Sequence, residues 1–590
     1  MVAGVLTAGS ASRGAGACEF DAAASHSSID TFPARAGVCG ADPRAPRGGA
    51  PCRCGMDILQ LYALDGDGTR SYRSRTGCDS GGDPTLSARR RLLQPGVISS
   101  NGGLQMAKAK PRFIMSWGRT YQTDGKLISL KMQRHISHRA KPLFYHPQGM
   151  GNYFTYREAI DVLGWEHTAV YKGGRIDLDP AEWSDLGWMC SYVGPPASAV
   201  EEMKRRCVAE NLGPYPPDLL SELRDLAAVK KFGRERGDDF EVIGVEGAQG
   251  GIGYTYLTYL DPGDEVIMPD PVYFHFAPAA LMAGATPVQI PLGPQNDYRL
   301  KPAEIKKHIN LRTKMIVICD PINPFGTTQS KEELLEIVKL ANDHNLLVFN
   351  NITHNTHQLD PKTRQYPIAA LHKEIDTSNV ISTSGMSKGY GMAALRLGFL
   401  AGHPDLLKAA AMMKMEITKI HTNLLAQYGA IAALKDKEYL QSAEATMRRN
   451  LAHVVESEKT WLANGCEVTI PVMPKYGFSM VLDISKTGAT AQEICVALFK
   501  RKVALYAGDG LGDVGAGTSI RINLSRSDLW AYEKLRTEMM PAVEEARTGI
   551  YADKIIRFFE EGGTPRGLHL AQELRALQAT RGKPRKMAAE

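Results

Sequence analysis

The stretch ISTSGMSKGYGMAALRLG, residues 381–398, carries the most informative pattern in the sequence. An apolar run ends in a Gly-rich turn that contains Lys388, and Arg396 follows eight residues later at the start of another apolar run. We expect a strand, a turn that presents Lys388, and a second strand. A lysine held in a pocket at a strand end can lose its proton and attack a carbonyl. Taken alone, the pattern fits an exposed lysine in a Gly-rich turn better, because lysine is mostly exposed.

Apolar runs of strand length continue on both sides of this stretch. They alternate with amphipathic segments such as 330–345, whose apolar residues have helical spacing. This alternation predicts an α/β protein with a mostly parallel sheet. The candidate strands are 240–247, 264–269, 285–292, 313–320, 345–350, 379–385 and 396–402.

Two long helical segments, 404–434 and 437–464, are predicted after the last of these strands. Four further apolar runs then predict a smaller βαβ-like domain, and a short helix and a basic end complete the chain as a solvated appendage. The four runs are 466–472, 477–485, 502–507 and 519–525.

The composition is that of an ordinary globular protein of more than one domain. The 70 Lys and Arg against 64 Asp and Glu leave a formal charge of +6 over 590 residues, which gives no reason to expect nucleic acid or an anionic membrane as a partner. No apolar run reaches the roughly 18 residues that a membrane span needs, and residues 1–30 lack the apolar core of a secretory signal. We therefore expect a cytoplasmic protein.

Residues 1–105 differ from the rest of the chain. They contain no Lys and five of the ten cysteines, whereas Lys is frequent from Lys108 onward. Few apolar clusters offset the entropy of ordering such a segment, so disorder is expected. An organelle transit peptide competes with this interpretation, but acidic residues such as Asp21 are rare in transit peptides. We favour a third interpretation, upstream sequence translated in frame, with the start at Met106 or Met115.

Three further segments supply groups that suit a phosphorylated planar ligand. A strand ends at Gly247, Ala248 and Gln249 and a helix begins there, so free backbone N–H groups are available to a phosphate. Tyr273 suits stacking on a planar ring. Asn323, in a Pro-Gly turn after a strand, suits donation to a phenolate oxygen. Each residue also has a purely structural explanation, but their joint occurrence in this order favours a ligand site.

Together these segments resemble the class I/II aminotransferases, the fold-type I enzymes that use pyridoxal 5'-phosphate (PLP). The resemblance covers about residues 185–545. It rests on a GAQ loop, DPGDEV, a D-P-x-Y segment, N-P-x-G, S-K with an Arg eight residues later, and a late Arg in TSIRINLS. It implies an α/β fold with a large, mostly parallel sheet domain sandwiched by helices and a smaller α/β C-terminal domain.

The domain boundaries that we expect combine this resemblance with the composition. They are 1–105 for a disordered or non-native extension, 106–235 for an N-terminal arm and part of the small domain, 236–425 for the large PLP-binding domain, 426–548 for the small C-terminal domain, and 549–590 for a basic tail.

The resemblance implies a role for each matching residue. Lys388 matches the lysine that binds PLP covalently and then moves a proton, and Arg521 matches the clamp on the substrate carboxylate. A planar carboxylate is best held by the bidentate fork of an arginine. Tyr215 matches a tyrosine that reaches the phosphate in the partner subunit, which implies a homodimer with a shared active site. The other cofactor positions are Gly247, Ala248, Gln249 and Arg396 for the phosphate, Tyr273 for stacking, and Asn323 for the ring oxygen and for substrate.

The sequence departs from the family pattern beneath the expected ring. An ungapped count places Asn351 where the family has an Asp under the pyridine nitrogen, and His354 where it has a Tyr. A carboxylate keeps that nitrogen protonated, whereas a neutral amide supplies no charge to hold the proton. Gly385 also replaces a common phosphate-binding Ser, for which Ser384 or Ser387 can substitute.

These residues predict a PLP-dependent aminotransferase that moves an amino group between an amino acid and a 2-oxo acid. Two alternatives stay open because of Asn351: another PLP reaction on the same fold (lyase, decarboxylase or oxidase), and a non-catalytic relative. No metal site is predicted, since His354 and His357 lack a nearby third ligand. The stretch 110–185, and Ile352 beside the ring, are expected to shape the substrate pocket.

Overall fold

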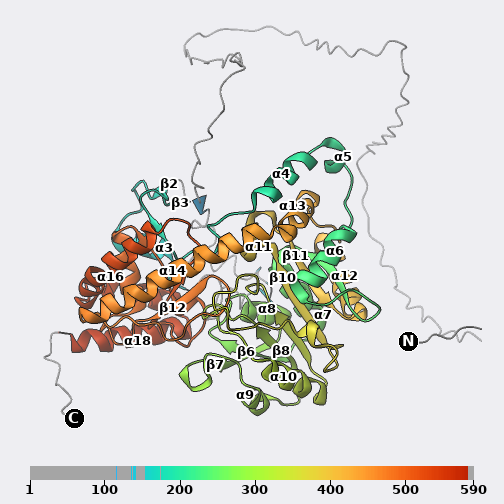
Figure 1. Ribbon diagram of the computed structural model, residues 1–590. Coiled ribbons are helices and arrows are strands. Elements are labelled where there is room, and N and C mark those ends of the chain that lie inside the picture. Colours follow the sequence, from blue (N-terminus) through green and yellow to red (C-terminus); the bar gives the residue numbers. More distant parts are fainter. Residues whose placement is uncertain are drawn as a thin grey trace, which may run out of the picture. The chain divides into compact units, whose positions relative to one another are not determined.

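The computed structural model describes residues 114–115, 135, 137, 139–140, 153–172 and 175–581 (Figure 1). All of them belong to one compact unit, residues 103–590. The predictions for residues 1–105 lie outside the described residues. Within the described part, no helix is both long enough and apolar enough to cross a membrane.

A seven-stranded sheet forms the centre of the larger part of this unit. Its order is β5-β11-β10-β9-β8-β6-β7, and the neighbours pair in parallel except for β11, which runs antiparallel to both β5 and β10. All seven strands predicted from the sequence are therefore confirmed. Their bounds are β5 Glu241–Val245, β6 Glu265–Asp270, β7 Thr286–Pro291, β8 Thr313–Cys319, β9 Leu347–Asn351, β10 Val380–Gly385 and β11 Gly398–Gly402.

Helices cover both faces of this sheet because both faces of its strands are apolar. In β6, Val266 and Met268 belong to one buried cluster and Ile267 to another, as the two-residue period of a strand requires. The first cluster includes residues of α7 Gly247–Tyr259, α8 Phe276–Ala283 and α12 Pro404–Thr418. The opposite face is covered by α9 Pro302–His308, α10 Lys331–Asp343 and α6 Ser221–Phe232. A sheet buried on both faces is typical of a parallel α/β fold.

A second, smaller sheet follows later in the chain. It has the order β12-β15-β14 and is antiparallel throughout, so the βαβ-like arrangement expected from the sequence is wrong. The apolar run 466–472 forms no strand of this sheet and contributes a single bridge between Thr469 and Asp483. The elements here are β12 Ser479–Asp483, α15 Ala491–Lys500, β13 Val503–Ala504, β14 Tyr506–Ala507, β15 Ser519–Asn523 and α16 Trp530–Arg547.

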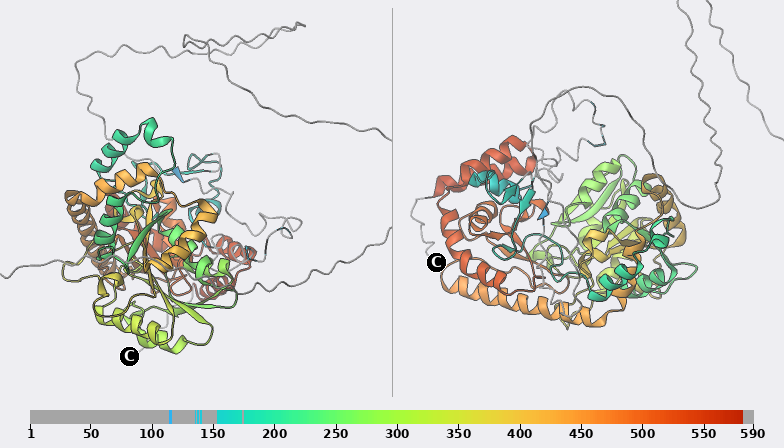
Figure 2. Two further views of the ribbon diagram at one scale, coloured as in Figure 1. Left: turned by 90° about the vertical axis from the view of Figure 1, so that its right-hand side faces the viewer. Right: turned by 90° about the horizontal axis from the view of Figure 1, so that it is seen from above.

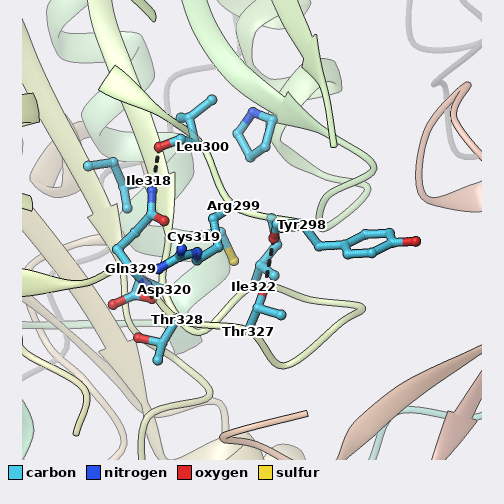
Figure 3. Close-up of a pocket in the computed structure, with 11 residues that line it drawn as sticks. Tyr298, Arg299, Leu300, Ile318, Cys319, Asp320, Ile322, Thr327, Thr328 and Gln329 are labelled. Carbon is cyan, nitrogen blue, oxygen red and sulfur yellow. Dashed lines mark hydrogen bonds between the residues drawn. The ribbon is translucent and has the colours of Figure 1, made fainter. Parts of the chain in front are cut away.

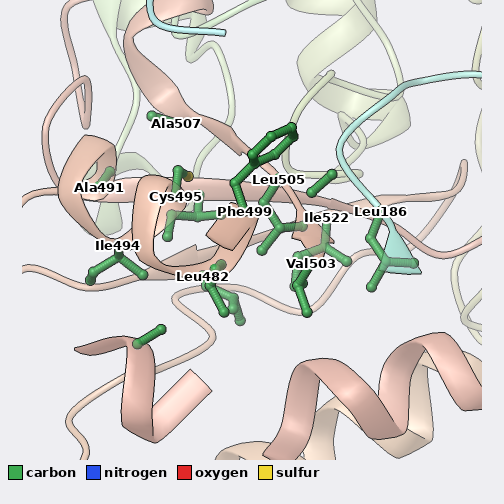
Figure 4. Packing of buried hydrophobic residues seen from close by; sticks show 14 of the residues in the cluster. Leu186, Leu482, Ala491, Ile494, Cys495, Phe499, Val503, Leu505, Ala507 and Ile522 are labelled. Atoms are coloured by element: carbon green, nitrogen blue, oxygen red, sulfur yellow. The ribbon is translucent and has the colours of Figure 1, made fainter. Parts of the chain in front are cut away.

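The small sheet packs around Phe499, Leu482 and Ile522, which are almost completely buried (Figure 4). Earlier segments of the chain join this core, since β13 pairs in parallel with β4 and Leu186 lies beside it. These earlier elements are β1 Ile114–Met115, α3 Tyr156–Leu163, β2 Tyr171–Lys172, β3 Arg175–Asp177 and β4 Ser184–Asp185.

The helical region between the sheets contains three helices rather than two. The segment predicted as 404–434 is divided, because α12 ends at Thr418 and α13 Leu424–Lys435 begins after a break at Lys419, whose φ is 71°. The long helix α14 Lys437–Ala463 then runs from the larger sheet region to the core of the smaller one (Figures 1 and 2). Two short helices, α4 Ala197–Arg206 and α5 Ala209–Leu212, precede α6.

Residues 552–580 pack against the core and so do not form part of a solvated appendage, whereas the basic end 582–590 lies outside the described residues. The packed segment forms helices α17 Ala552–Gly562 and α18 Pro565–Thr580, and α11 Met386–Gly389 is the remaining α-helix of the described residues. Ile555, Phe559 and Leu570 are buried in the core around the small sheet. The apolar residues lie on one face of α17, so burial of that face fixes the helix against the core.

Candidate active site

Two neighbouring cavities meet at Lys388. The first has a volume of about 100 Å³ and the second about 260 Å³. Both are lined by Tyr273, Asn323, Lys388, Ala393 and Arg396. The first is also lined by Ala248, Gln249, Cys319, Asn351, Thr353, His354, Gly385 and Ser387. The second is also lined by Tyr153, Trp188, Met189, Cys190, Phe274, His275, Tyr506, Ala507, Gly510, Leu511 and Arg521.

The first cavity lies at the carboxyl ends of the parallel strands. Asn351 ends β9, Cys319 ends β8, and Gly385 ends β10 immediately before the turn that carries Lys388. The carboxyl ends of neighbouring parallel strands meet at one edge of a sheet, and ligands of open α/β sheets bind there. Nine of the residues proposed from the sequence therefore come together, although they are up to 148 positions apart between Ala248 and Arg396.

Lys388 is the only lysine that lines either cavity in the described part of the chain. It belongs to the one-turn helix α11, and its Nζ donates to the carbonyl oxygen of Met189. Burial lowers the pKa of Lys388 to about 8, with a smaller contribution from the positive charge of Arg521. The neighbouring Cys190 stays a neutral thiol because burial raises its pKa to about 12. With this pKa, Lys388 has an appreciable neutral fraction near pH 7, and a neutral amine can attack a carbonyl.

The N-terminus of α7 forms a tight cradle with Arg396. Gly247 begins α7 with a φ of 70°, and Arg396 Nη2 donates to the Glu246 carbonyl oxygen at 3.1 Å. A Cβ at Gly398 would lie 2.5 Å from the Gly247 carbonyl carbon, so the β11 backbone lies directly against the helix start. The first backbone N–H groups of a helix have no partner within it and favour an anion, and Arg396 adds a positive charge beside them.

Tyr273 and Gln249 form one wall of the first cavity. The Tyr273 hydroxyl donates to Gln249 Oε1 at 3.3 Å, and its ring packs edge-on against Phe276 at 5.9 Å between centroids. Burial raises the pKa of Tyr273, so the hydroxyl is neutral. The ring is thereby held in one orientation at the boundary between the two cavities.

A braced loop positions Asn323. In this loop the Gln329 backbone N–H donates to Asp320 Oδ1 at 2.9 Å, and the Gln329 side chain donates to the Leu300 carbonyl at 2.6 Å (Figure 3). Thr327 Oγ1 also donates to the Tyr298 carbonyl at 2.7 Å. The small space within the loop, about 10 Å³, has room for about one water.

The side-chain oxygen of Asn323 is buried and has no hydrogen-bond partner among the described residues. An amide oxygen without a partner is costly to bury. A hydrogen-bond donor on a ligand in the cavity that Asn323 lines would relieve that cost.

Asn351 faces the first cavity, as the ungapped count predicted. Its Oδ1 accepts the Thr353 backbone N–H at 2.9 Å, which leaves the amide NH₂ as the group available to a ligand. His354 lines the same cavity, and burial lowers its pKa to about 3, so it is neutral. The described residues that line the cavity include two cations, Lys388 and Arg396, and no carboxylate.

Arg521 lines the second cavity. It lies on β15 opposite Tyr506, is 7% exposed, and has a buried Nε without a hydrogen-bond partner among the described residues. Burial lowers its pKa to about 10, so it remains charged at neutral pH. No carboxylate pairs with it in residues 153–172 and 175–581, and a buried unpaired guanidinium is costly without an anion.

The sequence interpretation missed much of the second cavity. Trp188, Phe274 and Tyr506 belong to separate segments that no motif connects. From the stretch 110–185, which was expected to shape this pocket, Tyr153 lines the cavity among the described residues. Ile352 was expected beside the ring, but it packs in the core with α6 and does not line the cavity.

The loop 508–513 forms part of the second cavity through Gly510 and Leu511. Arg566, at the start of α18, donates to the Asp509 carbonyl and pairs with the Asp513 carboxylate. The Asp509 carboxylate in turn accepts the Phe154 N–H at 2.6 Å, which places Tyr153 beside Gly510. The C-terminal helices therefore support this wall of the cavity.

Three of the residues proposed from the sequence lie outside the cavity walls. Gly247 lies behind the first cavity, in contact with Arg396. Ser384 is buried away from the cavity, whereas Ser387 lines it, so Ser387 is the available hydroxyl. Tyr215 is 84% exposed and stacks on His421 at 4.9 Å, so it does not reach the cavities of its own chain.

The first cavity suits a planar ring with an anionic arm and an aldehyde. The helix start and Arg396 suit the anion, Asn323 and Asn351 offer amide groups, and Lys388 offers an amine. The Asn323 amide NH₂ can donate to an oxygen on such a ring, and the glycine-lined cradle beside Arg396 suits its anionic arm. PLP therefore fits these residues, with a neutral Asn351 at the position where the family pattern has a carboxylate.

Comparison with known proteins agrees with this geometry. The family profile of aminotransferase class I and II matches residues 192–531. An aspartate aminotransferase of Pyrococcus abyssi is 30% identical over 346 residues, 58% of this chain and 86% of that protein. Aromatic-amino-acid aminotransferase 2 of Thermococcus litoralis is 29% identical over 58% of this chain and 86% of its own.

Solved structures show the same fold. The crystal structure of an aromatic aminotransferase from Pyrococcus horikoshii has a TM-score of 0.55 and 27% identity, and the match covers 61% of this chain and 95% of that chain. With the family profile matching more than half of its residues, the chain belongs to the class I and II aminotransferases, a family of amino-group transferases that are generally PLP-dependent.

Proposed function

We propose that this aminotransferase binds PLP in the first cavity through Lys388. The observation that carries the proposal is the position of Lys388, a lysine with a pKa of about 8 at the junction of the two cavities. One cavity has the size and groups for a phosphorylated ring, and the other contains a buried Arg521 that has no carboxylate partner among the described residues. An amine at such a junction can reach both a cofactor and a substrate.

Different residues around the first cavity suit different parts of PLP. The phosphate suits the backbone N–H groups at Ala248 and Gln249 with the guanidinium of Arg396. Asn323 suits the ring oxygen, and Tyr273 suits one face of the ring. Ser387, His354 and Asn351 complete the wall, and Asn351 offers its NH₂ toward the ring nitrogen.

When bound, PLP supplies an aldehyde carbon and an electron-accepting ring, which together allow an amino group to pass from an amino acid to a 2-oxo acid. Lys388 Nζ attaches the cofactor and, once displaced by a substrate amine, moves a proton at that amine's carbon. Arg521 binds the substrate carboxylate and orients the amine toward Lys388. The burial of Arg521 and the half-buried position of Lys388 strengthen these interactions by limiting the access of water.

We also propose that two copies of the chain form a dimer with shared active sites. Tyr215 is 84% exposed at the end of a segment whose neighbours Val208 and Leu212 are exposed apolar residues. The helix α5 has no buried residue in the single chain. A partner subunit would cover this apolar surface and place Tyr215 where the family resemblance expects it, near the partner's phosphate site.

Two measurements on purified protein test the proposal. After incubation with PLP and reduction with borohydride, peptide mass spectrometry should find the added mass on Lys388. With a mixture of amino acids, the PLP-loaded protein should release 2-oxo acids, and Lys388→Ala should not. Labelling of another lysine, or equal release by Lys388→Ala, would refute the assignment.

A further inference from the structure

The second cavity is lined mainly by aromatic and apolar side chains. Beyond the residues that it shares with the first cavity, its walls contain four large aromatic rings. Tyr153 and Phe274 lie 5.9 Å apart between ring centroids at an angle of 47°, and Trp188 and Tyr506 lie 6.2 Å apart at 46°. These separations are in the range where aromatic rings attract one another in tilted arrangements. Another ring inserted among them would meet faces and edges that suit it.

The charged groups of this cavity are few, and each has a role in the proposed function. Arg396 lies beside the helix start that suits the phosphate, Lys388 is the reacting amine, and Arg521 suits the carboxylate that every α-amino acid carries. No Asp or Glu occurs among the described residues that line the cavity. Among these described residues of one chain, a second substrate carboxylate would find no further cation, and a cationic side chain would find no carboxylate.

The remaining polar side chains do not supply a charge. Burial lowers the pKa of His275 to about 4, so the imidazole is neutral at pH 7. Burial also raises the pKa of Tyr506 and Tyr153, so both hydroxyls stay protonated. The described residues that line the cavity therefore offer a charged side chain no compensation for the loss of its water.

The space available also exceeds what a small side chain needs. At about 260 Å³, the second cavity is far larger than the roughly 10–15 Å³ that a single water occupies by the same measure. A methyl group would leave most of the aromatic surface without contacts, whereas a phenyl or indole ring would cover it.

From this distribution we infer that the amino donor is an α-amino acid with an uncharged aromatic or large apolar side chain. Its carboxylate binds Arg521, and its side chain lies among Tyr153, Trp188 and Phe274. This inference rests on the proposed function, because it uses Lys388 and Arg521 to orient the substrate. It adds to that function the class of the substrate side chain. The carboxylate side chains of aspartate and glutamate do not belong to this class.

The decisive experiment compares amino acids in single-turnover reactions with the PLP-loaded protein. Phenylalanine should exceed aspartate and glutamate in kcat/KM by about 100-fold or more, the discrimination expected when a charged group is buried without a partner. Leucine should lie between phenylalanine and alanine. A kcat/KM for aspartate equal to or above that for phenylalanine would overturn the inference.

A binding measurement separates this inference from the proposed function. Calorimetry on the PLP-loaded protein should show that 3-phenylpropanoate binds at least tenfold more tightly than succinate, whether or not turnover occurs. If no amino acid reacts, the proposed function fails, and the two carboxylates still decide the class of side chain. Tighter binding of succinate refutes the inference by itself.

Matched variants locate the preference in the cavity. Tyr153→Ala removes one wall and should lower kcat/KM for phenylalanine roughly tenfold more than for alanine, because the larger side chain loses more buried contact. The control is Tyr366→Ala, since Tyr366 is also half-buried but packs under α10, outside both cavities. This control should leave the ratio of kcat/KM for phenylalanine to kcat/KM for alanine unchanged. If Tyr153→Ala also left that ratio unchanged, the placement of the substrate side chain beside Tyr153 would be contradicted.

Discussion

The depressed pKa of Lys388 predicts how fast the protein takes up PLP at different pH. Only the neutral amine attacks an aldehyde, so the rate follows the unprotonated fraction. With a pKa of about 8 instead of the ordinary 10.5, roughly 9% of Lys388 rather than about 0.03% is neutral at pH 7. Burial of Lys388 beside the charged Arg521 therefore increases the reactive fraction about 300-fold.

The predicted pH profile has a bend. Between pH 6 and pH 8 the second-order rate of covalent PLP attachment should rise about 50-fold, and between pH 8 and pH 10 only about twofold more, because the amine is then largely neutral. A lysine with an ordinary pKa of 10.5 would instead accelerate about 75-fold over the second interval. Stopped-flow absorbance of PLP mixed with the apoprotein measures the rate.

Two further arms make this test decisive. Arg521→Gln removes a positive charge that lowers the Lys388 pKa, so the bend should move to higher pH. The same pH series with Nα-acetyl-lysine in place of the protein corrects for the ionisation of PLP itself. A rate that continues to rise about tenfold per unit from pH 8.5 to pH 10 would refute the conclusion that burial activates Lys388.

Three other substitutions test the remaining parts of the site. Asn351→Asp should raise the pKa of the bound pyridine nitrogen by about 1–3 units and speed amino transfer, and a pH titration of absorbance with single-turnover rates checks both. Arg521→Gln should weaken substrate binding by about 2 kcal/mol, or roughly 30-fold, while PLP attachment at saturating pH is retained. Gly398→Ala should lower PLP affinity and the Tm, because its Cβ would lie 2.5 Å from backbone at the start of α7. Its control is Gly253→Ala within α7, where a Cβ meets nothing within 4 Å and should stabilise by up to about 1 kcal/mol.

Each of these predictions has an outcome that contradicts it. Slower transfer in Asn351→Asp would show that the amide suits the ring better than a carboxylate. Unchanged substrate affinity in Arg521→Gln would remove Arg521 from the substrate site. Equal effects of Gly398→Ala and Gly253→Ala would show that the close approach of β11 to α7 does not shape the cradle.

The sheet could be predicted because its strands are short apolar runs bounded by Gly, Pro and Asp, with no competing periodicity. The antiparallel pairing of the small sheet could not be predicted, because the direction in which strands pair depends on the connections between them and not on the residues within a strand. The two-residue period explains why Asn351 faces the cavity although the adjacent Asn350 does not. The register that decides between them comes from the pairing of β9 with β8.

Motif residues of the first cavity were predictable because each follows a strand end within a short, distinctive segment. Thr353 and Cys319 line the same cavity and were missed, since nothing in their local sequence distinguishes them from core residues. The aromatic wall formed by Trp188 and Tyr506 unites segments more than 300 residues apart. Such a wall is a property of the tertiary fold and leaves no local signal.

Arg566 supports a wall of the second cavity, and this affects the order in which the two cavities can form during synthesis of the chain. Residues that line the first cavity lie between Ala248 and Arg396, so all of them leave the ribosome well before α18 does. The loop 508–513 gains its contact with Arg566 only after that last helix has emerged. Because chains fold domain by domain from the N-terminus, the first cavity can form early and the shape of the second cavity is fixed last.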